Sequence, residues 1–169
     1  MKKFFALVGF ILLFNRLSAQ ENKPSNTLTF TGLVKMEKVF SLADLRKWKT
    51  VDLGDVNTSC SRKKEEIAHG VKAILLKEVM DSVAFQYTNS HSLNSFYFKF
   101  IASDGYILVY SFGEIYNTET GNHLYLVMEK DGKPVSEIEN RILLLTTSDL
   151  KSGSRNMKWL EKIVVCKAE

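Results

Sequence analysis

The sequence predicts an α+β fold: a β-rich, mixed-sheet domain with a few short helices. Phe96, Phe98 and Phe100 alternate with other residues, as in a strand with one buried face. Asp104-Gly105 follows directly and supplies a hairpin turn. Helical periodicity is confined to two short segments, and strands do not alternate regularly with long helices. These observations argue against a doubly wound parallel sheet.

The other elements are assigned from periodicity and turn signals. Further strands are expected at 28–34, 106–112, 124–128, 141–147 and 157–166, with a second Asp-Gly turn at 131–132. Ser41 and Asp44 have the spacing of a capping box and predict a helix through Trp48. Apolar residues at 71, 74, 75 and 79 predict a second helix over 70–83. Residues 50–66 are polar, and we expect them to be irregular.

The N-terminus is typical of a secretory signal peptide over residues 1–19. Lys2 and Lys3 precede an apolar core too short to span a membrane, and Ala19 offers a small residue for cleavage. We expect a polar leader at 20–27 and a single domain over 28–169. The mature chain is therefore predicted to be exported, periplasmic or extracellular, with no stable membrane span after signal cleavage.

The apparent basic character of the chain comes from this N-terminal segment. The full chain carries 23 Lys+Arg against 19 Asp+Glu. Removal of Lys2, Lys3 and Arg16 leaves 20 against 19, because residues 1–19 contain no acid. A net charge near +1 predicts no nucleic-acid partner, so any cationic function must be local.

Two cysteines lie in the predicted mature chain, Cys60 and Cys166. A disulfide between them would close a loop of about a hundred residues and contribute on the order of 4–5 kcal/mol in the chain-entropy model. The alternative is one thiol with a special role and one that is buried and inert. The three histidines lie far apart in the sequence and form no recognised metal motif.

One segment near the C-terminus has the composition of an anion site. Ser154, Arg155 and Lys158 lie in a Gly/Ser-rich turn just before the last predicted strand. Backbone N–H groups, hydroxyls and fixed cations together are suited to a phosphate or another small anion. The alternative is that both cations are solvated charges flanking a strand.

Short motifs occur in a fixed order over residues 28–165. They are Gly32-Leu33-Val34, Phe40-Ser41-Leu42-Ala43-Asp44-Leu45, Gly70-Val71 with Leu75, Leu76 and Val79, Ser103-Asp104-Gly105-Tyr106, Asp131-Gly132-Lys133-Pro134, and Arg155-Asn156-Met157-Lys158-Trp159-Leu160. In this order they resemble the molybdopterin-binding domain of the sulfite oxidase family of oxidoreductases, in a divergent form.

The resemblance implies a cofactor and its contacts. Cys60 corresponds to the family's molybdenum-ligating cysteine, and Arg155 and Lys158 correspond to residues that hold the phosphate of molybdopterin. A soft thiolate suits such a metal. Lys2-Lys3 stands where a twin-arginine export signal carries two arginines, so we expect export in the unfolded state, without the cofactor.

Three functions follow from these observations. The leading hypothesis is an exported molybdopterin-domain-like binding or accessory module with a site for a small anion or a phosphate-bearing ligand. The first alternative is a molybdopterin-dependent oxidoreductase with Cys60 as its metal ligand. The second is an envelope module that binds a protein or a glycan through Tyr97, Tyr106 and Tyr110. The sequence does not indicate a protein partner.

Overall fold

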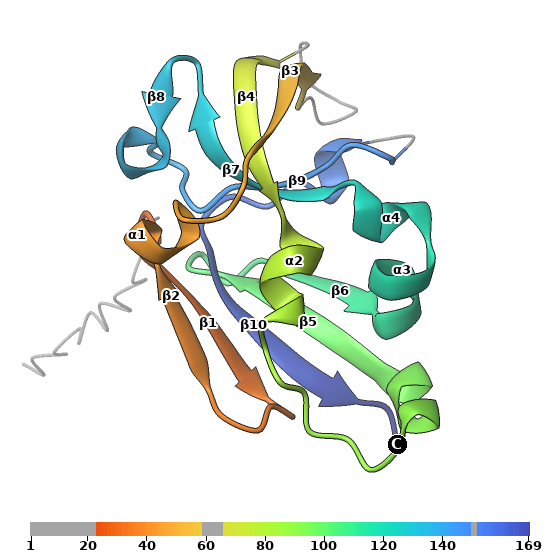
Figure 1. Ribbon diagram of the computed structural model, residues 1–169. Coiled ribbons are helices and arrows are strands. Elements are labelled where there is room, and N and C mark those ends of the chain that lie inside the picture. The colour runs from red at the N-terminus through yellow and green to blue at the C-terminus, as the bar shows by residue number, and fades with distance from the viewer. Residues whose placement is uncertain (1–22, 59–65, 150–151) are drawn as a thin grey trace, which may run out of the picture.

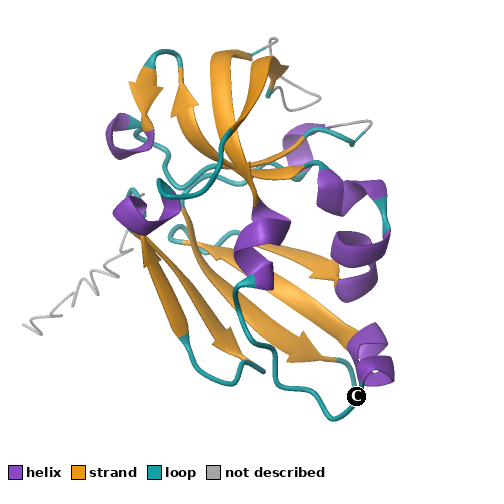
Figure 2. Ribbon diagram, viewed as in Figure 1, coloured by secondary structure: helices purple, strands orange, loops and turns teal. Residues whose placement is uncertain are grey.

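The structure is a computed structural model that describes residues 23–58, 66–149 and 152–169 (Figure 1). Two β-sheets lie one above the other, with short helices at their ends and edges (Figure 2). Ten strands and four short α-helices are found in the described part of the chain. The predicted α+β, β-rich fold class is confirmed.

The first sheet joins the two ends of the described chain. Its strands are β1 (Thr27–Gly32), β2 (Lys38–Ser41), β5 (Phe96–Ala102), β6 (Ile107–Ser111) and β10 (Leu160–Lys167), in the order β2-β1-β10-β5-β6. β1 and β10 pair in parallel and the other pairs are antiparallel, so this sheet is mixed. Alternate residues of β1 and β5 are buried, as the phenylalanine pattern of β5 predicts.

The second sheet is formed by strands from the middle of the sequence, and one of them, at its edge, comes from the polar segment 50–66. Its strands are β3 (Val51–Asn57), β4 (Ile67–Leu75), β7 (Leu124–Lys130), β8 (Lys133–Pro134) and β9 (Leu144–Thr146). The strands pair in the order β3-β4-β7-β8. β8 pairs with the C-terminal end of β7, and β9 pairs with its N-terminal end. β7 is buried along most of its length because strands flank both of its edges and side chains pack on both of its faces.

Short helices connect the strands. They are α1 (Leu42–Leu45), α2 (Leu76–Asp81), α3 (Phe112–Asn117) and α4 (Glu119–Asn122), with 3-10 turns η1 (Ser90–Ser95), η2 (Val135–Glu137) and η3 (Ser152–Ser154). The predicted capping box of α1 is present, with Asp44 N–H donating to Ser41 Oγ and Ser41 N–H donating to Asp44. In the part of the chain that the structure describes, no helix combines the length and hydropathy needed to cross a membrane.

The structure corrects several assignments made from sequence. Residues 51–57 form β3 rather than an irregular segment; this edge strand buries little, so its hydrophobic alternation is weak. Residues 70–75 belong to β4 rather than to a helix, and only 76–81 are helical. β4 and α2 are consecutive in the sequence. The apolar residues of the strand and of the helix together have the spacing of one helical face, which explains the wrong prediction. The helix predicted through Trp48 ends at Leu45, and the strand β2 and the helices α3 and α4 were not expected.

Candidate functional site

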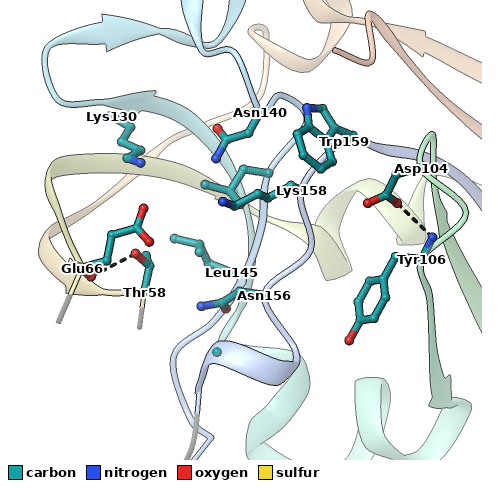
Figure 3. Close-up of a pocket in the computed structure, with 12 residues that line it drawn as sticks. Thr58, Glu66, Asp104, Tyr106, Lys130, Asn140, Leu145, Asn156, Lys158 and Trp159 are labelled. Atoms are coloured by element: carbon teal, nitrogen blue, oxygen red, sulfur yellow. Dashed lines mark hydrogen bonds between the residues drawn. The ribbon is translucent and has the colours of Figure 1, made fainter. Parts of the chain in front are cut away.

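A pocket lies where the two sheets meet the segment that leads into β10. Its cavity volume is about 250 Å³. Residues from three regions line it: Thr58 and Glu66 at the β3–β4 end, Asp104 and Tyr106 at the β5–β6 turn, and Asn156 and Lys158 before β10. Figure 3 shows the Lys158 ammonium pointing toward the side formed by Thr58 and Glu66.

The backbone of residues 155–158 determines which side chains enter this pocket. Met157 forms a β-bridge with Leu144, with N–H···O distances of 2.8 and 3.0 Å, and its side chain is buried. Side chains alternate in extended backbone, so Asn156 and Lys158 share the side opposite Met157. Both line the pocket, whereas Arg155 does not.

Among the residues that the structure describes, Lys158 is the cation of the pocket that has no competing partner. Its side chain is exposed and makes no hydrogen bond or ion pair within the described ranges. Two amide side chains line the same cavity, those of Asn140 and Asn156. Asn156 uses its Oδ1 to accept a hydrogen bond from Thr146 N at 3.0 Å, which fixes the amide beside Lys158.

The other charged groups of the pocket already have neighbours. Lys130 pairs with Asp131 at 3.6 Å, with only 16% of its side chain exposed. Asp104 accepts a hydrogen bond from Tyr106 N at 2.9 Å and so closes the β5–β6 turn. Glu66 also lines the cavity and has further contacts. Because the lining carries both signs, a small anion would bind Lys158 itself rather than a generally positive cavity.

Trp159 forms one edge of the pocket in a strained conformation. Its φ of 57° lies in the left-handed region, which bulky residues seldom adopt. Its backbone N donates to Asn140 O at 3.2 Å, and its Nε1 donates to Glu139 O at 3.2 Å. Its carbonyl accepts from Ser25 Oγ and from a backbone N–H. The orientation of the indole ring is therefore fixed.

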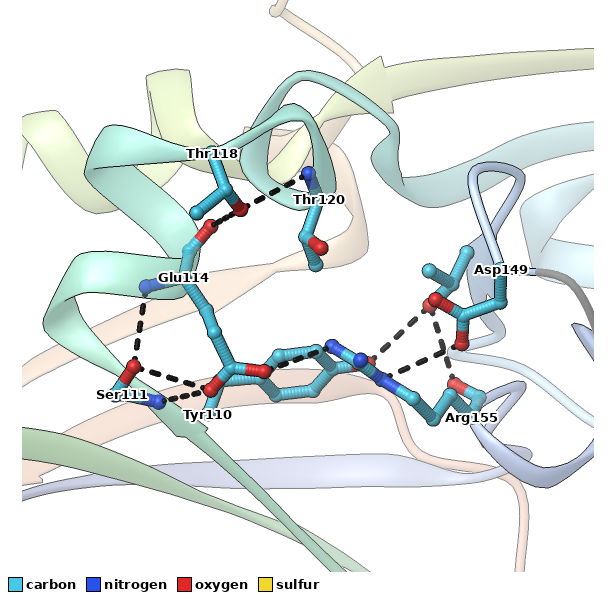
Figure 4. A network of polar contacts seen from close by, with 8 residues as sticks. Tyr110, Ser111, Glu114, Thr118, Thr120, Asp149 and Arg155 are labelled. Atoms are coloured by element: carbon cyan, nitrogen blue, oxygen red, sulfur yellow. Dashed lines mark hydrogen bonds and ion pairs between the residues drawn. The ribbon is translucent and has the colours of Figure 1, made fainter.

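Arg155 points away from this pocket into a network of its own (Figure 4). Its Nη2 lies 3.5 Å from Glu114 Oε1, and its Nε lies 3.4 Å from Asp149 Oδ2. The guanidinium carbon lies 4.3 Å from the centre of the Tyr110 ring, in cation–π geometry. Glu114 also caps α3, so Arg155 links the segment before β10 to that helix.

Tyr110 is the buried floor of the Arg155 network. Its hydroxyl lies 3.2 Å from Thr146 Oγ1. Burial raises the pKa of Tyr110, although the hydrogen bond with Thr146 and the nearby Arg155 act in the opposite direction. Because burial has the larger effect, the phenol is held neutral beneath the guanidinium.

The residues predicted as one anion site are therefore separated. Lys158 lies in the pocket and Arg155 lies in the ion-pair network. Ser154 is exposed; its carbonyl accepts a hydrogen bond from the Tyr106 hydroxyl at 2.8 Å. Cys60 lies outside the described residues, but Thr58 and Glu66, on either side of that gap, both line the Lys158 pocket.

Cys166 lies far along β10 from this pocket. It pairs with Tyr97, six residues and roughly 20 Å beyond Leu160. Cys166 is half-buried. Cys60 lies outside the described residues, so the pairing of the two cysteines stays a prediction. Within the described ranges no three His, Cys, Asp or Glu side chains gather as a metal site would require.

The described residues do not fit the phosphate-bearing pterin that the resemblance implies. One of the two cations assigned to the phosphate, Arg155, is held between Glu114 and Asp149 on the other side of the segment. Of the two cations that the resemblance assigns to the phosphate, only Lys158 lines the cavity.

Comparisons with known proteins support the fold. No family model matches the chain, and no curated protein matches it. Among solved structures, the chain is similar to the sulfane dehydrogenase SoxCD from Paracoccus pantotrophus, with a TM-score of 0.54 and 12% identity. The match covers 82% of this chain and 37% of the other, so this chain spans well under half of that protein. At this identity the similarity shows the fold alone, and it gives distant support to the resemblance found in the motifs.

Several pocket residues were not selected from the sequence as ligand contacts. Asn140 had no signal, because it lies in an irregular segment before β9. Asn156 and Trp159 were visible within the motif that carries Lys158, but their types alone did not indicate a ligand. Tyr106, one of the three tyrosines expected to contact a protein or a glycan, also lines the pocket, whereas Tyr110 of the same set is buried.

Proposed function

We propose that this protein is an exported binding or accessory module that holds a small anionic group at Lys158. The ligand class is a carboxylate or a phosphate-bearing molecule. The observation that carries the proposal is the Lys158 ammonium, which lines a cavity of about 250 Å³ without an ion-pair partner in the described part of the chain.

The surroundings of Lys158 support this ligand class. A hydrogen bond to a charged group contributes about 1.5–3 kcal/mol, roughly twice a neutral one. The amides of Asn140 and Asn156 add donors beside the ammonium, while Lys130 is already engaged by Asp131. An anion at Lys158 would therefore meet one full charge and up to two amide donors. This predicts weak to moderate affinity with strong dependence on Lys158.

The test is a titration with inorganic phosphate, followed by NMR shifts of backbone amides around 153–159. We expect millimolar or tighter binding to the wild type and at least tenfold weaker binding to Lys158→Gln. Lys162→Gln is the matched control, because Lys162 is an exposed lysine of β10 that does not line the pocket. Equal phosphate affinity in Lys158→Gln and the wild type would disprove the anion site.

Two further measurements address the rest of the proposal. N-terminal sequencing of the mature protein from its native host is expected to begin near Gln20; an intact Met1 would contradict export by signal cleavage. Metal analysis of the same material addresses the oxidoreductase alternative. Molybdenum at one atom per chain, lost in Cys60→Ser, would replace the binding-module proposal with the enzyme.

A further inference from the structure

Two pockets adjoin across Trp159. Beside the Lys158 pocket lies a second, of about 520 Å³, which is lined by Lys133, Asp131 and Glu137 from the region around β8. Four residues line both pockets: Lys130, Asn140, Lys158 and Trp159. The indole and the Lys158 side chain therefore stand between two cavities that one extended ligand could occupy together.

The chemistry of the second pocket differs from that of the first. Its lining carries three carboxylates and three lysines: Asp131, Glu137, Glu139, Lys130, Lys133 and Lys158. A bare anion gains little there, because carboxylates repel it. A ligand with hydroxyl groups matches such a lining, because each hydroxyl donates to a carboxylate and accepts from an ammonium or an amide.

Trp159 supplies a fixed apolar platform between these polar linings. Its side chain is half-buried, its Nε1 is bound to Glu139 O at 3.2 Å, and its backbone stays at a φ of 57°. Such strained residues persist where the surroundings hold them and are concentrated at ligand sites. A flat aromatic ring with polar groups on both sides suits a ring-shaped ligand with an apolar face and a polar rim.

We infer that the ligand is an acidic saccharide of at least two sugar units. Its carboxylate binds Lys158, one sugar ring packs on Trp159, and the hydroxyls of the next unit meet Glu137 and Lys133 in the second pocket. This inference rests on the proposed anion site at Lys158 and assigns its ligand class. A peptide is disfavoured because the second pocket is lined mainly by charged side chains and offers few apolar contacts.

The test uses tryptophan fluorescence, because the chain has two tryptophans, Trp48 and Trp159. In Trp48→Phe the signal comes from Trp159 alone. Titration of this variant with digalacturonic acid is expected to change its emission, with affinity at least tenfold above that for galacturonic acid or inorganic phosphate. In Trp159→Phe the same titration should leave the emission of Trp48 unchanged.

Two substitutions separate the pockets. Glu137→Gln changes an exposed side chain of the second pocket and should weaken digalacturonic acid several-fold while leaving phosphate binding unchanged. Trp159→Asn removes the platform at a position whose positive φ asparagine tolerates, and NMR titration should show at least tenfold weaker binding of the disaccharide.

The outcomes distinguish this inference from the function on which it rests. If phosphate binds through Lys158 but the disaccharide gains nothing over the monosaccharide, the saccharide inference is wrong and the anion site stands. If neither ligand depends on Lys158, both are wrong. Equal disaccharide affinity in Trp159→Asn and the wild type also overturns the inference, provided that the NMR spectrum shows the variant to be folded.

Discussion

Arg155 and Lys158 lie three residues apart and have opposite environments. Arg155 is 29% exposed, lies over Tyr110 and is flanked by Glu114 and Asp149. Lys158 is exposed in a pocket and has no ion-pair partner within the described ranges. The Met157–Leu144 bridge makes the segment extended, so an odd spacing places the two cations on opposite sides. One cation thus serves stability, and the other is available to a ligand.

The largest expected loss of stability comes from disrupting the packing of α3, the helix that carries the Arg155 partner Glu114. A Cβ on the buried Gly121 would overlap the carbonyl group of Ile115, so Gly121→Ala must displace α4 from α3, which carries Glu114. We expect a loss of at least about 2 kcal/mol in the free energy of unfolding, measured with urea. In contrast, Gly113→Ala meets little obstruction inside α3 and should add about 0.5–1 kcal/mol. Equal stability of the two variants would show that this packing is not as tight as described.

A smaller loss is expected when the cation itself is removed. Arg155→Met leaves Glu114 and Asp149 without their partner and removes the contact with Tyr110. Because these groups are partly exposed, we expect a loss of about 1–3 kcal/mol in urea unfolding. Lys158→Met should change stability by less than about 0.5 kcal/mol. The comparison fails if the two substitutions have equal cost.

The smallest expected effect is a loss of folding stability at high pH, caused by Tyr110 on the Arg155 side. The raised pKa of Tyr110, caused mainly by burial, means that folding opposes its ionisation. Its contribution to stability is complete below the unfolded pKa near 10 and is lost as the pH rises above that value, by at most about 1.4 kcal/mol per pH unit. Urea midpoints between pH 9 and 11 should therefore fall less in Tyr110→Phe than in the wild type. Tyr87→Phe, at a half-exposed tyrosine, should retain the wild-type decline.

Much of the fold could be predicted from the sequence because the patterns that indicate it involve residues close together in the chain. The Phe96–Phe100 alternation, the Asp-Gly turns and the Ser41–Asp44 capping box each depend on neighbouring residues, and each is present. The β3 strand and the strand character of residues 70–75 were missed because they depend on cross-strand partners. No periodicity within one segment reports those partners.

The candidate site divides in the same way. The sequence indicated the segment that carries Lys158, because a cation beside a Gly/Ser turn is a local pattern. It could not show that Asn140 and Thr58 line the same cavity as this lysine, since these residues come from distant parts of the chain. Nor could it show that Arg155 forms ion pairs with the carboxylates of Glu114 and Asp149.

The sequence by itself determined the fold class, the main hairpins and the position of one cationic segment, since hydrophobic alternation and turn chemistry act over a few residues. Only the tertiary structure decided how the two cations are used. The bridge to Leu144 sets the direction of each side chain, and the packing of distant strands supplies two carboxylates to Arg155 and a cavity to Lys158.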